Sequence, residues 1–205
     1  LAANGSYTYA ANTAAADALD PGDVVSESFN YTVSDGNGGT DIAVITITII
    51  GINDNPVANN DTNSVAPSQT LTVTDGSSDV LNNDTDVDAH ASLSVSSITA
   101  TTAGGSATDV NPGTTYSSGY TSITGSYGTL RIGADGTYQY IAGSSGGTDV
   151  FTYTLSDGAA TDTGTLTITV NSPPVAADNT GTINENATLS VSDGASANDV
   201  TPVSR

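Results

Sequence analysis

The stretch FNYTVSDGNGGTDIAVITITI (residues 29–49) decides the fold of this chain. In its first part, Phe29, Tyr31 and Val33 alternate with polar residues, and in its last part isoleucines alternate with threonines as far as Ile49. An apolar residue at every second position places one face of a strand on a core and the other in water. The SDGNGG between the two runs is typical of a tight connection. We therefore expect an antiparallel hairpin.

This pattern belongs to an internal repeat. FTYTLSDGAATDTGTLTITV (151–170) matches the opening stretch, NGSYTY (4–9) matches DGTYQY (135–140), and residues 55–78 match residues 173–196. Pro56 and its counterpart Pro174 are 118 residues apart, a spacing that is long for a solenoid and ordinary for a sandwich domain. The repeat predicts three regions: the second half of a β-sandwich unit (1–52), a complete unit (53–171) and the first half of a further unit (172–205).

The strands of the complete unit are also visible in its residue types. Leu130 and Ile132 lead through GADG to Tyr138 and Tyr140, and the Asp-Gly pair suits a tight hairpin turn. Thr and Val are abundant, helix-favouring residues are scarce, and no stretch has a 3.6-residue apolar period. We expect an all-β protein with seven or more antiparallel strands per unit, packed as two sheets.

The composition excludes several functions. The net charge is −20, from 22 acidic and two basic residues, which disfavours nucleic acid and anionic membranes as partners. No run reaches the roughly 18 apolar residues of a membrane span. Cysteine is absent and His90 is the only histidine, so neither a zinc site nor a hydrolytic triad is expected. We expect no enzymatic activity.

The acidic residues themselves point to calcium. Asp84, Asp86 and Asp88 are two residues apart, and in an extended segment their carboxylates would lie on one side. Calcium binds six to eight oxygens from carboxylates, amides and backbone carbonyls. The alternative is that these acids are turn residues and solvated loop charge, which we favour for Asp109 and Asp135.

The candidate calcium ligands fall into two groups. The first surrounds the linker between residues 1–52 and the complete unit, and Asp35 is expected at the end of the first hairpin that faces this linker; its members are Asp35, Asn53, Asp54, Asn55, Asp61, Asp84, Asp86 and Asp88. The second is expected at the following junction and comprises Asp157, Asp178, Glu185 and Asp193.

Several motifs in order carry a family resemblance. GTLRIGADGTYQYIAG, DVFTYTLSDGAATDTGTLTITV, VLNNDTDVDAHASLSV and the linker GINDNPVANND resemble the VCBS and cadherin-like repeats of large secreted bacterial adhesins of the RTX type. The resemblance implies tandem immunoglobulin/cadherin-like β-sandwich repeats with calcium at the junctions. Two features depart from the family pattern: Ala89 and His90 follow the third aspartate, and the second linker, VNSPPVAADN, lacks Asn-Asp-Asn.

The resulting functional hypothesis is a structural extender of an extracellular bacterial adhesin or surface filament, rigidified by calcium and in contact with neighbouring repeats. Two alternatives remain. In the first, the chain is a filament or matrix subunit whose segment 172–205 completes residues 1–52 of the next copy by strand complementation, head to tail. A fragment of a longer repeat array would explain the same interrupted frame. In the second, less favoured alternative, the chain is an adhesin tip that binds carbohydrate or protein.

Overall fold

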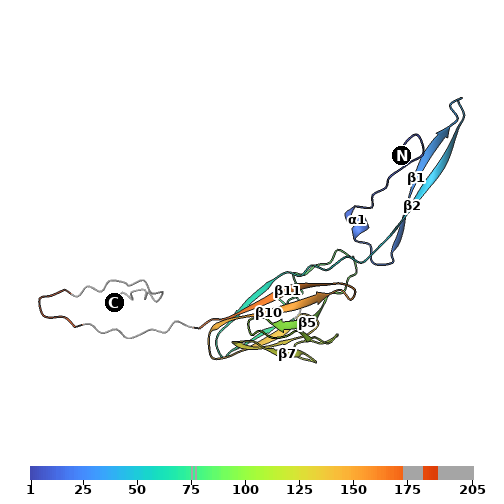
Figure 1. Ribbon diagram of the computed structural model, residues 1–205. Helices are drawn as coiled ribbons and strands as arrows, with labels where there is room; N and C mark the ends of the chain where they lie inside the picture. The colour runs from blue at the N-terminus through green and yellow to red at the C-terminus, as the bar shows by residue number, and fades with distance from the viewer. Residues whose placement is uncertain (75, 77, 173–181, 189–205) are drawn as a thin grey trace.

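The computed structural model describes residues 1–74, 76, 78–172 and 182–188 (Figure 1). Two units follow one another in it. The N-terminal unit, residues 1–50, contains the short helix α1 (Ala14–Asp17) and the strands β1 (Val24–Ser34) and β2 (Thr40–Ile50). The central domain, residues 53–172, contains the other strands. Residues 51–54 form the linker, and its last two residues are also the first two of the central domain.

The expected hairpin of the N-terminal unit is confirmed. β1 pairs with β2 in antiparallel register, with Phe29 opposite Ile45 and Val25 opposite Ile49, so the alternating apolar residues share one face. The four-residue α1 was not expected from the sequence. It is a single turn, whose first N–H groups are capped by Thr13: the Thr13 Oγ1 accepts a hydrogen bond from the Ala16 N–H at 3.3 Å.

The central domain is built from two sheets, as the sequence predicts. In spatial order, the five-stranded sheet consists of β3 (Asp61–Val65), β11 (Thr161–Val170), β10 (Gly147–Ser156), β5 (Ser94–Ala100) and β6 (Thr108–Asp109). The four-stranded sheet consists of β4 (Thr70–Val73), β9 (Tyr138–Ala142), β8 (Gly128–Ile132) and β7 (Thr121–Thr124).

One strand pair corrects the expectation that all strands are antiparallel. β3 lies parallel to β11, with Asp61 opposite Leu166 and Val65 opposite Val170. The reason is the direction in which the chain enters. The linker reaches the domain beside the turn that joins β10 to β11, so β3 and β11 both start near the linker and run away from it.

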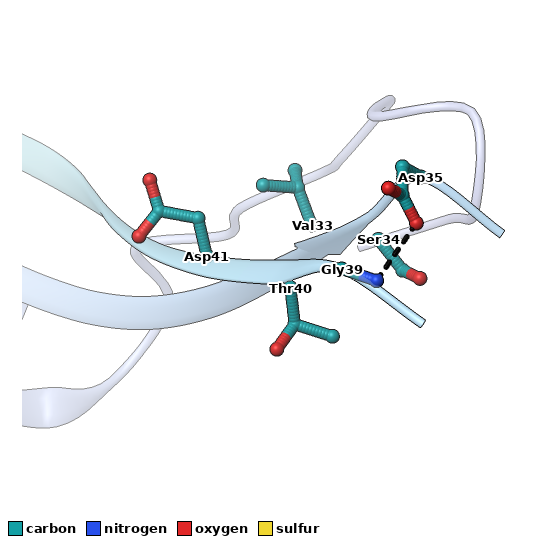
Figure 2. Close-up of a pocket in the computed structure, with 6 residues that line it drawn as sticks. All are labelled: Val33, Ser34, Asp35, Gly39, Thr40 and Asp41. Atoms are coloured by element: carbon teal, nitrogen blue, oxygen red, sulfur yellow. Dashed lines mark hydrogen bonds between the residues drawn. The ribbon is translucent and has the colours of Figure 1, made fainter. Parts of the chain in front are cut away.

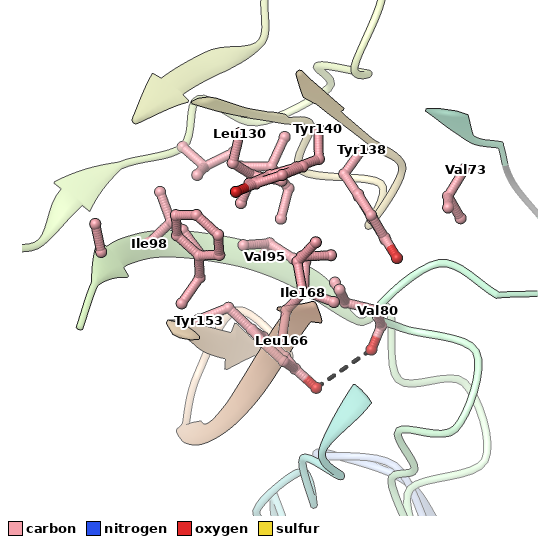
Figure 3. Packing of buried hydrophobic residues seen from close by; sticks show 14 of the residues in the cluster. Val73, Val80, Val95, Ile98, Leu130, Tyr138, Tyr140, Tyr153, Leu166 and Ile168 are labelled. Carbon is pink, nitrogen blue, oxygen red and sulfur yellow. Dashed lines mark hydrogen bonds between the residues drawn. The ribbon is translucent and has the colours of Figure 1, made fainter. Parts of the chain in front are cut away.

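The core lies between the two sheets and consists of the alternating residues of their strands (Figure 3). Phe151 and Tyr153 of β10 meet Tyr138 and Tyr140 of β9, and all four side chains are completely buried. The Tyr140 hydroxyl donates a 2.6 Å hydrogen bond to buried Asp149. Burial, and then this bond to the carboxylate, raise the pKa of Tyr140. Each large apolar side chain buried in this way stabilises the domain by about 1.5–3 kcal/mol.

Candidate metal site at the junction of the two units

The start of the linker is held against the turn at residues 20–23 of the N-terminal unit. The Gly51 N–H donates a hydrogen bond to the Asp23 carbonyl at 2.9 Å, and the Gly51 carbonyl accepts one from the Gly22 N–H at 3.2 Å. A Cβ at residue 51 would clash with the backbone carbonyls of Leu19 and Asp20. Glycine is therefore required for this close approach, and the turn at residues 20–23 lies beside the linker.

Asp88 of the 84–88 loop contacts the linker, and Asp86 contacts Asp88. Asp88 is 6% exposed, and its Oδ2 accepts a hydrogen bond from the Asp54 N–H at 3.1 Å. Asp86 is half-buried, and its Oδ1 accepts one from the Asp88 N–H at 3.0 Å. The second oxygen of each, Asp88 Oδ1 and Asp86 Oδ2, is buried and has no hydrogen-bond partner among the described residues. Buried carboxylate oxygens without partners are costly, so they require a partner that the protein atoms do not supply, either a water molecule or a cation.

Asn53 joins the linker to the far turn of the same domain. Its Nδ2 donates to the Asp157 Oδ2 at 2.9 Å and to the Asp54 carbonyl at 2.6 Å. The amide thus lies between two oxygens, one of them a carboxylate. We call Asn53, Asp54, Asp86, Asp88 and Asp157 the junction cluster.

A contact between the two units borders this cluster. The Asp20 carboxylate accepts a 2.9 Å hydrogen bond from the His90 N–H and also contacts the His90 imidazole Nδ1. The hydrogen bonds from the His90 backbone and side chain lower the pKa of Asp20, and in return Asp20 raises the pKa of His90. Sequence reasoning missed Asp20. The antiparallel hairpin could have predicted its position. The start of β1 must lie beside the end of β2, where the linker begins, and Asp20 lies just before β1.

Asp61 and Asp84 form a separate group inside the central domain, the interior acid pair. The Tyr153 hydroxyl lies 3.0 Å from both Asp84 oxygens and can donate its one proton to this carboxylate, and the Asn59 N–H donates to Asp84 Oδ1 at 2.7 Å. Burial raises the pKa of Asp84, and burial with the nearby charges of Asp84 and Asp79 raises the pKa of Asp61 to about 7. The buried Asp61 Oδ2 has no hydrogen-bond partner in the described part of the chain.

The three aspartates of the 84–88 loop therefore do not act as one cluster. Asp84 accepts a hydrogen bond from Tyr153 in the interior, whereas Asp88 accepts one from the linker and Asp86 accepts one from the Asp88 N–H. The segment is not an extended strand: it has turns at both ends and a single bridge between Thr85 and Val57. The alternation that would align three carboxylates is lost at those turns.

The position expected for Asp35 is wrong. Asp35 lies in the turn after β1, at the tip of the hairpin that is remote from the linker, as Figures 1 and 2 show. Its Oδ1 accepts hydrogen bonds from the Asn37 and Gly39 N–H groups at 2.7 and 2.9 Å, and these bonds lower the pKa of Asp35. Asp35 is a turn residue here, because the turn of each hairpin faces the preceding junction rather than the following one.

Asp157 is the counterpart of Asp35 in the β10–β11 turn, which also faces the preceding junction. It was expected at the second junction, but it lies at the first, where it accepts the hydrogen bond from Asn53. Asn55 is exposed on the linker side of β3. Glu185 is exposed in a turn of the described segment 182–188. Asp178 and Asp193 lie outside the described residues, so the expected second junction stays a prediction.

The junction cluster has the ligand types that calcium prefers but too few carboxylates to hold the ion by themselves. Among the described residues, no three or more Asp, Glu, His or Cys side chains are close enough together to hold a metal ion. The donors at the junction cluster are nevertheless all oxygens of the kind calcium binds, and two of them are buried without partners. Carboxylates alone do not complete a site, so the Asn53 amide, backbone carbonyls and water would have to supply the other ligands.

The comparison with known families now decides the classification. Residues 53–172 match the model of the bacterial cadherin-like domain. The chain belongs to this family. Residues 1–48 match the bacterial Ig domain, so the two described units are a cadherin-like and an Ig-like domain in tandem. The fold class expected from the sequence is confirmed. No curated protein matches the chain.

Solved structures similar to the chain are distant. Mouse clustered PcdhgC3 EC1-3 is 14% identical with a TM-score of 0.35, and the match covers 76% of this chain and 45% of that one. The endo-fucoidan hydrolase MfFcnA4 from glycoside hydrolase family 107 is 17% identical (TM-score 0.32; 78% and 20% covered). A protein from Bacteroides thetaiotaomicron is 15% identical (TM-score 0.29; 59% and 92% covered). The chain thus spans less than half the length of the first two. The described part of the chain contains no helix with the length and apolar character of a membrane span.

Proposed function

We propose that this chain is an extender module of a secreted bacterial adhesin or surface filament of the VCBS type, in which calcium at the junction cluster fixes the cadherin-like domain against the preceding Ig-like unit. The role is mechanical rather than enzymatic. The observation that carries the proposal is the pair of buried, unpartnered oxygens, Asp86 Oδ2 and Asp88 Oδ1, beside the linker.

The charge distribution supports a cation from solution. Four of the five members of the junction cluster are acids. Arg131 lies over the ring of Tyr120 at 4.9 Å, and Arg205, which is the only other Lys or Arg in the sequence, is outside the described residues. The His90 imidazole is engaged by Asp20. Without a cation, the carboxylates repel one another across the linker. A divalent ion would relieve this repulsion.

The residues that would hold calcium come from the linker and from two segments of the central domain. Asp86 and Asp88 belong to the 84–88 loop, Asn53 and Asp54 to the linker, and Asp157 to the β10–β11 turn. An ion bound by all three segments would fix the linker to the central domain. The Asp20–His90 contact joins the preceding unit to a residue just after the 84–88 loop. The protein's own contribution is to keep two carboxylate oxygens of the 84–88 loop buried and without partners among its own atoms.

The first prediction tests this site. Calcium at a hundredfold excess over its Kd should stabilise the chain by about 2.7 kcal/mol, so chelation should lower the Tm of the central domain. Small-angle X-ray scattering should show a less extended chain in chelator. The double variant Asp86→Asn/Asp88→Asn should lose both responses, because it removes the charge that binds the ion.

The matched control is Asp109→Asn, which makes the same type of change on exposed β6, away from the linker. This variant should respond to calcium as the original chain does. Isothermal titration of the original chain with calcium should give saturable heat. If titration gives no heat and chelator changes neither Tm nor scattering, the calcium proposal is wrong, although an extender role without metal would survive.

A further inference from the structure

Two tight turns lie beside the linker, one from each unit. In the N-terminal unit, a 2.9 Å hydrogen bond from the Asp23 N–H to the Asp20 carbonyl closes a turn, which we call the N-terminal turn. In the central domain, a 3.3 Å hydrogen bond from the Ala91 N–H to the Asp88 carbonyl closes a second turn, the central turn. Asp88 belongs to the junction cluster, so the central turn carries a candidate ligand of the ion.

Each of these turns is hydrogen-bonded to the linker. Gly51, at the start of the linker, donates through its N–H to the Asp23 carbonyl at 2.9 Å. Asp54, at the end of the linker, donates through its N–H to the Asp88 Oδ2 at 3.1 Å. The N-terminal turn is thus fixed to one end of the linker and the central turn to the other.

A direct contact between the two turns completes a ring of hydrogen bonds that includes the linker. The Asp20 Oδ1 accepts a 2.9 Å hydrogen bond from the His90 N–H, and the Asp20 Oδ2 contacts the His90 imidazole Nδ1. Both oxygens of Asp20 therefore hold the central turn, two residues after Asp88. The His90 side chain is 84% exposed, and an exposed ion pair alone contributes little to stability. The importance of this contact is that it closes the ring.

A closed ring restricts the orientation of each of its members. The central turn is held by Asp20 as well as by Asp54, so the carboxylate of Asp88 has fewer orientations available. A ligand that is already held in its bound orientation loses less conformational entropy when the ion binds. Coupling between two binding events is reciprocal, so an ion that fixes Asp88 must strengthen the contact between the turns by the same factor.

We propose that Asp20 is a positioning residue for the calcium site: through His90 it holds the central turn, so that docking of the N-terminal unit and calcium binding at the junction cluster strengthen each other. The inference rests on the proposed calcium site. Asp20 acts through His90 and not as a ligand, since both of its oxygens already contact His90. The preceding unit thus sets the calcium affinity of the junction that follows it.

Calcium titrations of the whole chain test this coupling. Asp20→Ala removes both contacts with His90 and should weaken calcium binding about fivefold or more. The matched control is Asp23→Ala, which removes the same charge from the same turn but keeps the backbone carbonyl that bonds Gly51. This variant should bind calcium as the original chain does. Equal losses of affinity in the two variants would mean that only charge acts, and they would overturn the proposal.

The sign of a third variant separates positioning from charge. The His90 imidazole is neutral or positive, so His90→Ala would leave the affinity for a cation unchanged or raise it if charge alone acted. If His90 positions Asp88, the same variant should weaken calcium binding, by less than Asp20→Ala because the His90 N–H remains. The double variant should lose no more affinity than Asp20→Ala alone, because both changes break one contact. Unchanged or higher affinity in His90→Ala overturns the proposal.

Hydrogen exchange of the His90 N–H measures the reciprocal effect, because this group donates to Asp20. Calcium should slow its exchange several-fold in the original chain. In Asp86→Asn/Asp88→Asn, which keeps Asp20 and His90, calcium should not change it. Equal exchange in calcium and in chelator, in a chain whose titration shows saturable binding, overturns the coupling and leaves the calcium site standing. If titration shows no saturable binding, the proposed function is wrong and this inference falls with it.

Discussion

The β1–β2 hairpin and the β10–β11 hairpin have nearly the same sequence but different surroundings. Phe29 is 46% exposed and its counterpart Phe151 is completely buried; Tyr9 is 36% exposed and its counterpart Tyr140 is completely buried. Both hairpins nevertheless form with equivalent register. The difference teaches that alternation and turn residues are sufficient to specify a hairpin, whereas burial depends on strands supplied from elsewhere in the chain.

The largest expected difference between the two hairpins is the loss in the free energy of unfolding when their phenylalanines are replaced by alanine. Phe151→Ala should destabilise the central domain by roughly 3–5 kcal/mol, because it leaves a cavity in a closed core. Phe29→Ala should cost about 1 kcal/mol or less, since its ring is already half in water. Urea unfolding followed by tyrosine fluorescence measures both. Similar costs would mean that the N-terminal face is covered in solution.

The largest response to pH should come from the interior acid pair of the central domain. Asp61 keeps its proton to about pH 7, whereas an aspartate in the unfolded chain loses its proton near pH 4. Between these values the folded state binds more protons, so the free energy of unfolding should fall as pH rises from about 4 to about 7 and then level off. Thermal unfolding in chelator at pH 5 and 7.5 measures this.

The variant Asp61→Asn should lose most of that fall and melt several degrees higher than the original chain at pH 7.5. The raised pKa of Asp84 should leave a smaller fall in the same direction. Asp109→Asn, an exposed acid outside the interior acid pair, should keep the full pH dependence. A Tm that rises between pH 5 and 7.5 would contradict the assignment of Asp61.

The smallest expected difference concerns the two hairpin turns. Asp157 accepts a bond from Asn53, whereas Asp35 has no contact with the linker. A double-mutant cycle of Asn53→Ala with Asp157→Ala should give a coupling energy of about 0.5 kcal/mol. The same cycle with Asp35→Ala should give none. Equal couplings would show that the turn of the first hairpin also reaches the linker.

The sequence predicts those features that depend on residues close together along the chain. Alternation identified β1, β2, β10 and β11, and the GADG turn identified the β8–β9 hairpin. The parallel pairing of β3, the position of Asp157 and the contact of Asp20 were not predicted, because each depends on the end of the domain at which the chain enters. Likewise, spacing in the sequence could not reveal that Asp84 turns inward to Tyr153 while Asp88 turns outward to the linker.

The parallel pairing of β3 and β11 determines how the central domain carries tension. The chain enters through β3 and leaves through β11, and five residue pairs, from Asp61–Leu166 to Val65–Val170, join these strands. A pull on the two ends of the domain draws the strands past each other along their length. All the hydrogen bonds of the pair are then loaded at once, instead of opening one after another as in an unzipped hairpin. The first and last strands thus form a shear clamp, which lets the domain transmit force along the chain without extending.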